Sequence, residues 1–267
     1  MYGIDISNYQ KTLDLTKFNF DFAMVKATEG RNNKCPVFET QVEQLTRLNK
    51  LIGCYHYARP DLNGTVSLMQ EEAANFVAAI RKMGLLGKAI LVLDWEQSPT
   101  NRYDLAKAWL DKVEDLTGVT PFIYASTSTI RANKSFYTAW PLWVAAWPST
   151  GKVNHPAGIE WITNQCPHDI PWLIWQYTSN GAVNGYSGRV DLDYTTLTES
   201  SWDDFATAGI KEAKKEGVIE ELTDDMKWAI NNGLMKGYFD GTYRPTEPLT
   251  RQAAATLLRR LYNLVMN

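Results

Sequence analysis

Two carboxylic acids that stand two residues apart, Asp94 and Glu96, follow an apolar run at residues 89–93. An uninterrupted apolar run of this length is typical of a strand that is buried on both faces. Because residues i and i+2 of a strand point to the same side, both acids should project together from the C-terminal end. Mutual repulsion and partial burial favour the protonated form of one carboxyl at neutral pH. A protonated carboxyl beside a carboxylate can act as a general acid that protonates a leaving oxygen. The alternative is two strand-end acids that cap the next helix.

Polar and aromatic residues also stand at the ends of other apolar runs. Any one of them could be structural, but their recurrence predicts a shared site, because barrel enzymes build their sites from the C-terminal ends of several strands. Together with the acid pair, they are Asp5, Lys26, Glu29, Tyr57, Tyr124, Trp147, Gln176 and Asp191. The predicted strands are residues 2–6, 22–27, 51–57, 89–93, 121–125, 142–146, 172–177 and 189–194.

Helical patterns at residues 36–48, 65–83 and 102–116 separate several of these runs. Alternating strands and helices indicate parallel strands with right-handed crossovers. Eight strands within about 200 residues favour an α/β fold of the (β/α)8-like barrel type over an open sheet. Residues 148–171 are rich in Pro, Gly and Asn, so the second half of the barrel is expected to be irregular.

Composition narrows the class of function. The formal net charge of −3 gives no field that would attract nucleic acid or an anionic membrane. The 10 Trp and 13 Tyr combine apolar faces with polar groups, as a carbohydrate cleft requires. Three Cys and three His show no metal-ligand spacing, so we expect no metal and no cofactor. The N-terminus lacks the pattern of a signal peptide, which predicts synthesis in the cytoplasm without an export signal.

With these residues assembled, the sequence resembles the family 25 glycoside hydrolases, the Chalaropsis-type lysozymes of fungi, bacteria and phage endolysins. The resemblance runs in order through residues 1 to about 197. Its motifs are Gly3-Ile4-Asp5-Ile6-Ser7, Val25-Lys26-Ala27-Thr28-Glu29-Gly30, Gly53-Cys54-Tyr55-His56-Tyr57-Ala58, Leu93-Asp94-Trp95-Glu96, Tyr124 after Pro121, Leu142-Trp143-Val144-Ala145, Trp175-Gln176-Tyr177 and Val190-Asp191-Leu192-Asp193.

The resemblance implies cleavage of the β-1,4 bond between N-acetylmuramic acid and N-acetylglucosamine in peptidoglycan, without a metal. Carried over residue by residue, it implies Glu96 as the proton donor, Asp94 as its partner, and Asp5 and Asp191 as the rest of an acidic ring. Asp193 shares a strand face with Asp191, so the assignment between these two stays open. The predicted substrate-binding residues are Tyr124, which resembles the family's active-site tyrosine, with Tyr57, Lys26, Trp147 and Gln176.

The mechanism has two alternatives. An ionised Asp94 could orient the substrate's 2-acetamido group for attack on the anomeric carbon, which gives retention without a protein nucleophile. Alternatively, Asp5 or Asp191 could activate a water, which gives inversion. We favour retention with Glu96 as the general acid.

The sequence divides into a catalytic barrel at 1–198, a linker or helix at 199–217 and a C-terminal module at 218–267. Residues 237–245, Gly-Tyr-Phe-Asp-Gly-Thr-Tyr-Arg-Pro, and Leu249-Thr250-Arg251 resemble an S-layer homology motif, although Gln252 stands where that motif usually has an acid. The resemblance implies binding to a secondary cell-wall polysaccharide, with Arg244 and Arg251 as anion contacts. Self-association, or simple packing on the barrel, is the alternative.

The leading hypothesis is therefore a peptidoglycan hydrolase, an N-acetylmuramidase with a wall-binding tail, of the phage endolysin kind. It would be made without a signal peptide and act on the wall after release at lysis or secretion. A chitinase-like or glucosaminidase-like hydrolase is the second hypothesis. The third is a non-catalytic wall-binding protein, against which the intact acid set Asp5, Asp94, Glu96 and Asp191 argues.

Overall fold

A computed structural model describes residues 1–207, 223–232, 234, 254, 257–258 and 261–262. The chain divides into two compact units, Met1–Ile210 and Lys211–Asn267. The first unit extends beyond residue 198, because helix α7 (Glu199–Thr207) packs against the barrel instead of leaving it as a linker. In the described part of the chain, no helix is both long and apolar enough to cross a membrane.

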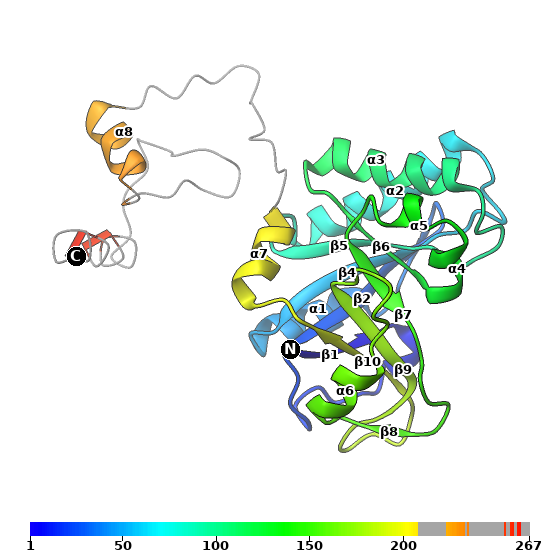
Figure 1. Cartoon of the computed structure of the whole chain (residues 1–267). Helices are drawn as coiled ribbons and strands as arrows, with labels where there is room; N and C mark the ends of the chain where they lie inside the picture. The colour runs from blue at the N-terminus through cyan, green and yellow to red at the C-terminus, as the bar shows by residue number, and fades with distance from the viewer. Residues whose placement is uncertain (208–222, 233, 235–253, 255–256, 259–260, 263–267) are drawn as a thin grey trace. The chain divides into compact units, whose positions relative to one another are not determined.

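Eight strands of the first unit close into a barrel, as the sequence predicts (Figure 1). Around the barrel they follow the order β1 (Tyr2–Ile6), β10 (Val190–Thr195), β9 (Ile174–Ala182), β7 (Leu142–Ala145), β6 (Phe122–Ser126), β5 (Ala89–Asp94), β4 (Leu51–Tyr57) and β2 (Phe22–Glu29). β2 pairs with β1 and completes the circle. Two short strands, β3 (Asn33–Lys34) and β8 (Val153–Asn154), pair with β2 and β9 outside this path.

The parallel direction that strand-helix alternation indicates does not extend to β10, which is antiparallel to both β9 and β1. Only residues 183–189 connect β9 to β10. A parallel crossover needs a dozen or more residues, so this connection must return as a hairpin. Gly185, at φ +77, supplies the left-handed conformation that the turn uses.

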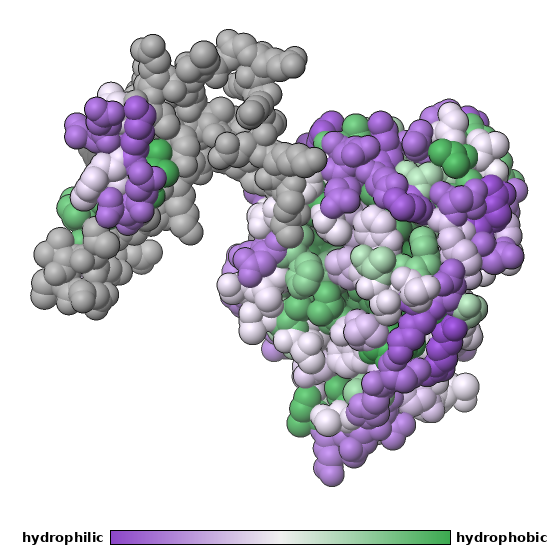
Figure 2. Space-filling model, turned by 45° about the horizontal axis from the view of Figure 1, so that its top comes forward, coloured by the Kyte–Doolittle hydropathy of each residue, from purple (hydrophilic) through white to green (hydrophobic). Residues whose placement is uncertain are grey.

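Helices cover the outside of the barrel unevenly. The longer helices α1 (Phe38–Arg47), α2 (Val66–Lys82) and α3 (Tyr103–Thr117) follow strands of the first half. Thr65 caps α2 by accepting a hydrogen bond from the backbone N–H of Leu68, which satisfies a donor that the helix leaves free. The second half has only the short helices α4 (Thr127–Ala132), α5 (Lys134–Tyr137) and α6 (Ile159–Gln165), which confirms its predicted irregularity. The face shown in Figure 2 is mostly hydrophilic, with scattered hydrophobic residues.

Alternation along the strands creates two separate apolar cores. Leu91 and Leu93 of β5 pack between the sheet and the helices, whereas Ile90 and Val92 fill the inside of the barrel. This is the period-two pattern expected of a strand that is covered on both faces. The interior is full of large side chains, and a Cβ at Gly3 would lie 2.3 Å from the ring of Phe22.

Helix α7 closes one end of the barrel. Trp202 is fully buried in the interior cluster, with its ring centroid 5.0 Å from that of Phe22. Phe205 packs edge-on against Phe122 at 5.1 Å. Because Phe22 and Phe122 begin their strands, α7 covers the N-terminal end and leaves the opposite end for a site.

In the second unit, helix α8 (Asp224–Asn231) begins at Thr223, whose side chain accepts a hydrogen bond from the backbone N–H of Met226. It lies within the predicted C-terminal module.

Candidate active site

A cleft of about 180 Å³ opens among the C-terminal strand ends. The structure brings all four predicted catalytic residues to its lining: Asp5, Asp94, Glu96 and Asp191. Four of the five predicted substrate-binding residues also line it: Lys26, Tyr57, Tyr124 and Gln176. Trp147 lies beside the cleft and reaches it through a hydrogen bond to Gln176.

The Asp94 and Glu96 side chains share the cleft because Trp95 between them points the other way. Trp95 is fully buried in the outer core, and its indole N–H donates to the carbonyl of Thr100 at 3.0 Å. Its backbone N–H donates to the carbonyl of Tyr124 at 3.0 Å, so pairing with β6 continues past the end of β5. Strand geometry therefore holds both acids on the cleft side, as predicted.

These two carboxyl groups differ in their surroundings. Asp94 is buried, and its Oδ1 has no hydrogen-bond partner among the described residues, whereas Glu96 is exposed to the cleft. Burial, followed by the charge of Glu96, raises the pKa of Asp94 well above its usual value. Loss of solvation also raises the pKa of Glu96, which the charge of Lys26 opposes.

These pKa shifts run against the expectation that Asp94 stays ionised. Two interacting acids release their protons as a pair, and both pKa shifts favour retention of a proton by Asp94 and Glu96. Glu96 faces the open cleft and is the member that can deliver this proton to a bound substrate.

A second acidic group lies on the opposite strands. Asp5 stands directly across from Asp191 in the β1–β10 pairing, and Asp193 lies one alternation further along. Burial, then the charges of Asp191 and Asp193, raises the pKa of Asp5 well above its usual value. Burial raises the pKa of Asp191 to about 6. Burial and the neighbouring charges therefore favour a protonated carboxyl in this group.

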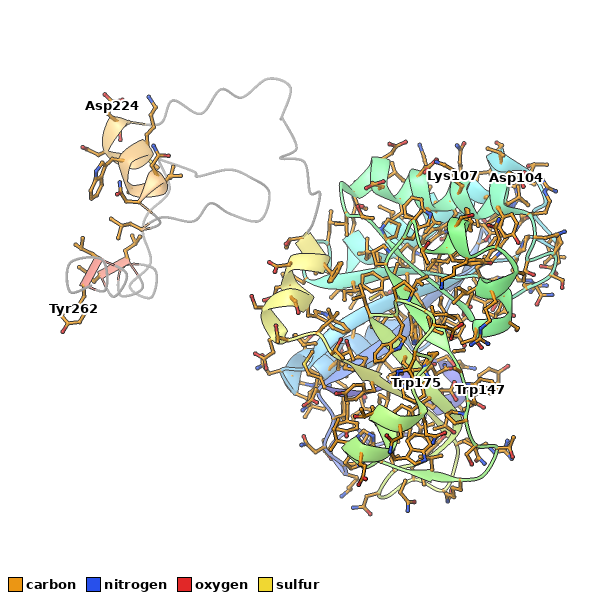
Figure 3. All side chains as sticks on the ribbon, viewed as in Figure 1. Asp104, Lys107, Trp147, Trp175, Asp224 and Tyr262 are labelled. Atoms are coloured by element: carbon orange, nitrogen blue, oxygen red, sulfur yellow. The ribbon has the colours of Figure 1, made fainter. Side chains whose placement is uncertain are left out.

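Gln176 fixes the orientation of this second acidic group. Its amide Nε2 donates to Asp5 Oδ2 at 2.8 Å. Its Oε1 accepts from the hydroxyl of Tyr124 and from the indole N–H of Trp147, both at 3.0 Å. One amide therefore joins a buried acid, the predicted active-site tyrosine and Trp147, which is 52% exposed. Trp147 is labelled in Figure 3.

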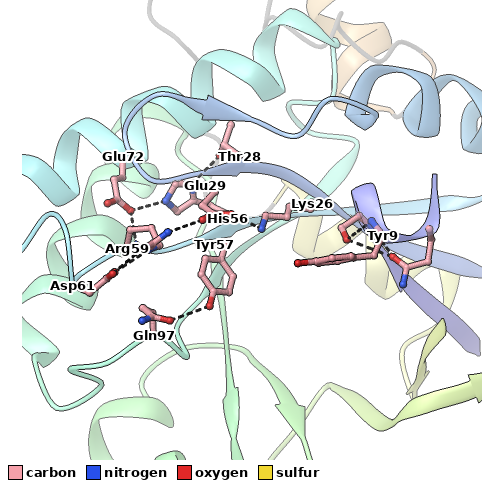
Figure 4. Close-up of polar contacts among 12 residues, drawn as sticks. Tyr9, Lys26, Thr28, Glu29, His56, Tyr57, Arg59, Asp61, Glu72 and Gln97 are labelled. Carbon is pink, nitrogen blue, oxygen red and sulfur yellow. Dashed lines mark hydrogen bonds and ion pairs between the residues drawn. The ribbon is translucent and has the colours of Figure 1, made fainter. Parts of the chain in front are cut away.

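A neutral ion cluster supports the other wall of the cleft (Figure 4). Lys26 Nζ lies 2.7 Å from Glu29 and 4.5 Å from the centre of the Tyr57 ring. Arg59 binds Glu29 at 2.9 Å and Asp61 at 2.8 Å. Burial alone would raise the pKa of Glu29, but the hydrogen bonds from Lys26 and Arg59 lower it. Lys26 and Glu29 therefore pair with each other at this end of the strand.

His56 is a buried structural residue, as its place inside an apolar strand indicates. Its Nδ1 lies 2.7 Å from Thr28 Oγ1 and its Nε2 lies 2.8 Å from Glu72 (Figure 4). Burial lowers the pKa of the imidazole, although the bond to Glu72 opposes that shift. The side chain does not reach the cleft lining.

Three residues of the site are not predicted in the roles that the structure gives them. Tyr55 lines the cleft and Asp193 is fully buried behind it. Trp143 also lines the cleft, but it is only 2% exposed and donates from its indole N–H to Asp193 Oδ1 at 2.8 Å. Strand alternation could have indicated two of these residues. Tyr55 stands two residues before Tyr57 and Asp193 two residues after Asp191, so each shares a strand face with a predicted site residue.

Arg244 and Arg251, the predicted wall contacts, lie outside the described residues. Within the described part of the chain, no group of three or more His, Cys, Asp and Glu residues is placed to hold a metal ion.

Comparisons with known proteins agree with this geometry. The chain is 28% identical over 225 residues to the uncharacterized protein YegX of Escherichia coli, covering 79% of this chain and 75% of that one. It is 28% identical over 207 residues to lysozyme M1 of Streptomyces globisporus, covering 71% and 65%. The structure of a family 25 lysozyme from Aspergillus fumigatus matches with a TM-score of 0.53 and 25% identity, covering 77% and 98%.

Two family models match the chain in order. The S-layer homology domain matches residues 221–255. The model of the glycosyl hydrolases family 25 matches residues 4–186, which include Asp5, Asp94 and Glu96. The chain therefore belongs to the glycosyl hydrolases family 25 and is a glycoside hydrolase with a C-terminal S-layer homology segment.

Proposed function

We propose that this chain is an N-acetylmuramidase that cleaves the β-1,4 bond from N-acetylmuramic acid to N-acetylglucosamine in peptidoglycan. The observation that carries the proposal is the convergence of Asp94 and Glu96 with Asp5 and Asp191 on one cleft. Family membership and the similarity to lysozyme M1 support the same activity.

In this proposal Glu96 protonates the glycosidic oxygen with the proton that the Asp94–Glu96 pair retains. As that proton leaves, Asp94 and the second acidic group stabilise the positive charge that grows at the sugar ring. In the same proposal the ionised Asp94 orients the 2-acetamido group of the substrate, so we retain acetamido-assisted retention as the proposed course.

The test is a reducing-end analysis of digested peptidoglycan. The purified chain is incubated with walls, the products are reduced with borohydride, and the reduced sugars are identified by mass spectrometry. We expect new reducing ends on N-acetylmuramic acid. New ends on N-acetylglucosamine would replace this proposal with the glucosaminidase or chitinase-like alternative, and no new ends would favour a non-catalytic wall-binding protein.

We further propose that the S-layer homology segment anchors the enzyme to a secondary cell-wall polysaccharide, consistent with the match at residues 221–255. Pelleting of the full chain with purified walls measures this role. Replacing Arg244 and Arg251 together by Ser should reduce the pelleted fraction, with Arg102, which is paired with Asp104 in the first unit, as a control position. Unchanged pelleting would show that neither arginine makes the proposed contact. A change in the molecular mass of the double variant in solution, compared with wild type, would favour self-association. In this scheme the enzyme reaches the wall by release at lysis or by secretion.

A further inference from the structure

A second depression adjoins the catalytic cleft. This side groove has a volume of about 380 Å³, and its lining includes Ser7, Tyr9, Lys26, Glu29, Asn33 and Lys34. Three of these residues, Ser7, Tyr9 and Lys26, also line the catalytic cleft. The two depressions therefore adjoin each other across these residues, so a branch of a substrate in the cleft has the groove beside it.

The charge of the lining reverses between the two depressions. The catalytic cleft holds four carboxyl groups and one lysine. The side groove holds two lysines and one glutamate, and Glu29 is already bound by both Lys26 and Arg59. Lys34 is exposed and forms no ion pair within the described part of the chain. The groove thus offers an available cation beside a cleft that repels anions.

Tyr9 forms the wall between the depressions and is 86% exposed. Its ring extends from the short helix η1 (Asn8–Gln10) toward Lys26 in Figure 4. The support below the ring is fixed, because Gln10 donates from Nε2 to the carbonyl of Arg189 at 3.2 Å, and Gln41 donates from Nε2 to the carbonyl of Ser7 at 3.0 Å. An exposed aromatic ring on a rigid support presents contact area at little entropic cost on binding.

The opposite wall is also built before any ligand arrives. Strand β3 pairs with the end of β2, with Lys34 across from Thr28 and Asn33 across from Glu29. The next residue, Cys35, donates its backbone N–H to the carbonyl of Ala27 at 2.9 Å. These backbone bonds present the Lys34 ammonium and the Asn33 amide at the rim of the groove.

We propose that the side groove binds the acidic peptide branch carried by N-acetylmuramic acid while the glycan lies in the catalytic cleft. This inference rests on the proposed function, because only a muramic sugar carries such a branch on its lactyl group. The carboxylates of the branch match the cation at Lys34, its amides match Asn33, and its apolar side chains match the face of Tyr9. The acidic cleft would disfavour the same carboxylates.

The test compares two substrates prepared from one peptidoglycan. One retains its peptides, and the other is glycan from which an N-acetylmuramoyl-L-alanine amidase has removed them. KM and kcat are measured by the release of reducing ends, expressed per muramic acid. The variants are Lys34→Glu and the milder Lys34→Gln. Lys88→Glu is the control, because Lys88 is exposed and precedes β5 at the opposite end of the barrel.

We expect Lys34→Glu to raise KM for the peptide-bearing glycan by about threefold to tenfold at low salt, the range that one exposed ion pair and its reversal allow. Lys34→Gln should show a smaller rise. KM for the stripped glycan, kcat for both substrates and all values for Lys88→Glu should stay at wild type. The difference should shrink at about 0.5 M salt, because exposed charges are then screened.

Equal KM values for wild type and Lys34→Glu on the peptide-bearing glycan would overturn the inference while leaving the proposed function in place. An equal rise on both glycans would assign Lys34 to the sugar chain and would also overturn it. Failure of the wild-type chain to cleave either glycan would overturn the proposed function together with the inference.

Discussion

The two acidic groups of the cleft are built in different ways. Asp94 and Glu96 come from one strand and stand two residues apart, and Glu96 is exposed to the cleft. Asp5, Asp191 and Asp193 come from opposite ends of the barrel sequence and meet only through the antiparallel pairing of β1 with β10. The pKa shifts of the first group favour a retained proton at an open edge, whereas the second group is held by the fixed donors of Gln176 and Trp143.

This difference suggests a division of labour. A proton donor must release its proton to a substrate, which suits an exposed carboxyl with an acidic neighbour. A group that stabilises developing positive charge works best when it does not reorganise, which suits buried acids with fixed hydrogen bonds. The predictions below separate the two roles.

The largest effect is expected on the exposed side. Glu96→Gln removes the proposed donor while keeping its shape, and it should lower kcat on peptidoglycan by about a hundredfold or more. Far-UV circular dichroism should remain that of wild type. Glu43→Gln, an exposed change on α1, serves as the matched control and should keep full activity. Wild-type clearing of cell walls by Glu96→Gln would remove Glu96 from the role of donor.

The buried side should show a pH-dependent cost in stability. Because folding raises the pKa of Asp191 from 3.8 to about 6, the fold favours its neutral form. The contribution of neutral Asp191 to the free energy of unfolding is fully present below the unfolded-state pKa and is lost as the pH rises through about 6. The Asp191→Asn side chain cannot ionise, so the variant does not lose stability as the pH rises. Its free energy of unfolding should therefore exceed that of wild type by roughly 2 kcal/mol at about pH 8.

Urea unfolding of both proteins, followed by tryptophan fluorescence, measures this difference. At about pH 3.5 the two proteins should have nearly the same stability, because Asp191 is then neutral in both states. Activity of Asp191→Asn should fall even as its stability rises, as is common where an active site stores unfavourable charge. A stability difference that does not change with pH would contradict the proposed burial of charge.

The smallest effect is expected at the edge of the buried side. Trp147→Phe removes the indole donor to Gln176 Oε1, which still accepts from Tyr124. Loss of one partly exposed hydrogen bond should raise KM on peptidoglycan by about threefold and leave kcat unchanged. Steady-state kinetics on soluble glycan would measure it. A large loss of kcat would instead show that Trp147 holds the acidic group in place.

The same contrast explains what could be predicted from the sequence. The eight strands, the Asp94–Glu96 pair and the polar strand ends depend on short-range patterns. The strands are visible as short apolar runs, and the acids and other polar residues follow at the ends of those runs. The family motifs then carried the assignment across the rest of the cleft.

Long-range features were harder to predict. The reversal of β10, which sets Asp5 opposite Asp191, depends on a connection too short for a crossover, and strand-helix alternation concealed it. The burial of Trp143 and its bond to Asp193 depend on how full the barrel interior is. The upward pKa shift of Asp94 could not be predicted for the same reason, because burial depends on neighbours from other strands.

The claim on which the chemistry depends is that the Asp94–Glu96 pair retains one proton near neutral pH. Carbon-13 NMR titration of the side-chain carboxyl groups measures this directly, with Asp94→Asn and Glu96→Gln used to assign the two resonances. We expect one step of the pair to occur well above the ordinary pKa values of 3.8 and 4.5, and to fall toward the ordinary range in either variant. Two independent titrations near those ordinary values in the wild-type protein would contradict the proposed proton donor.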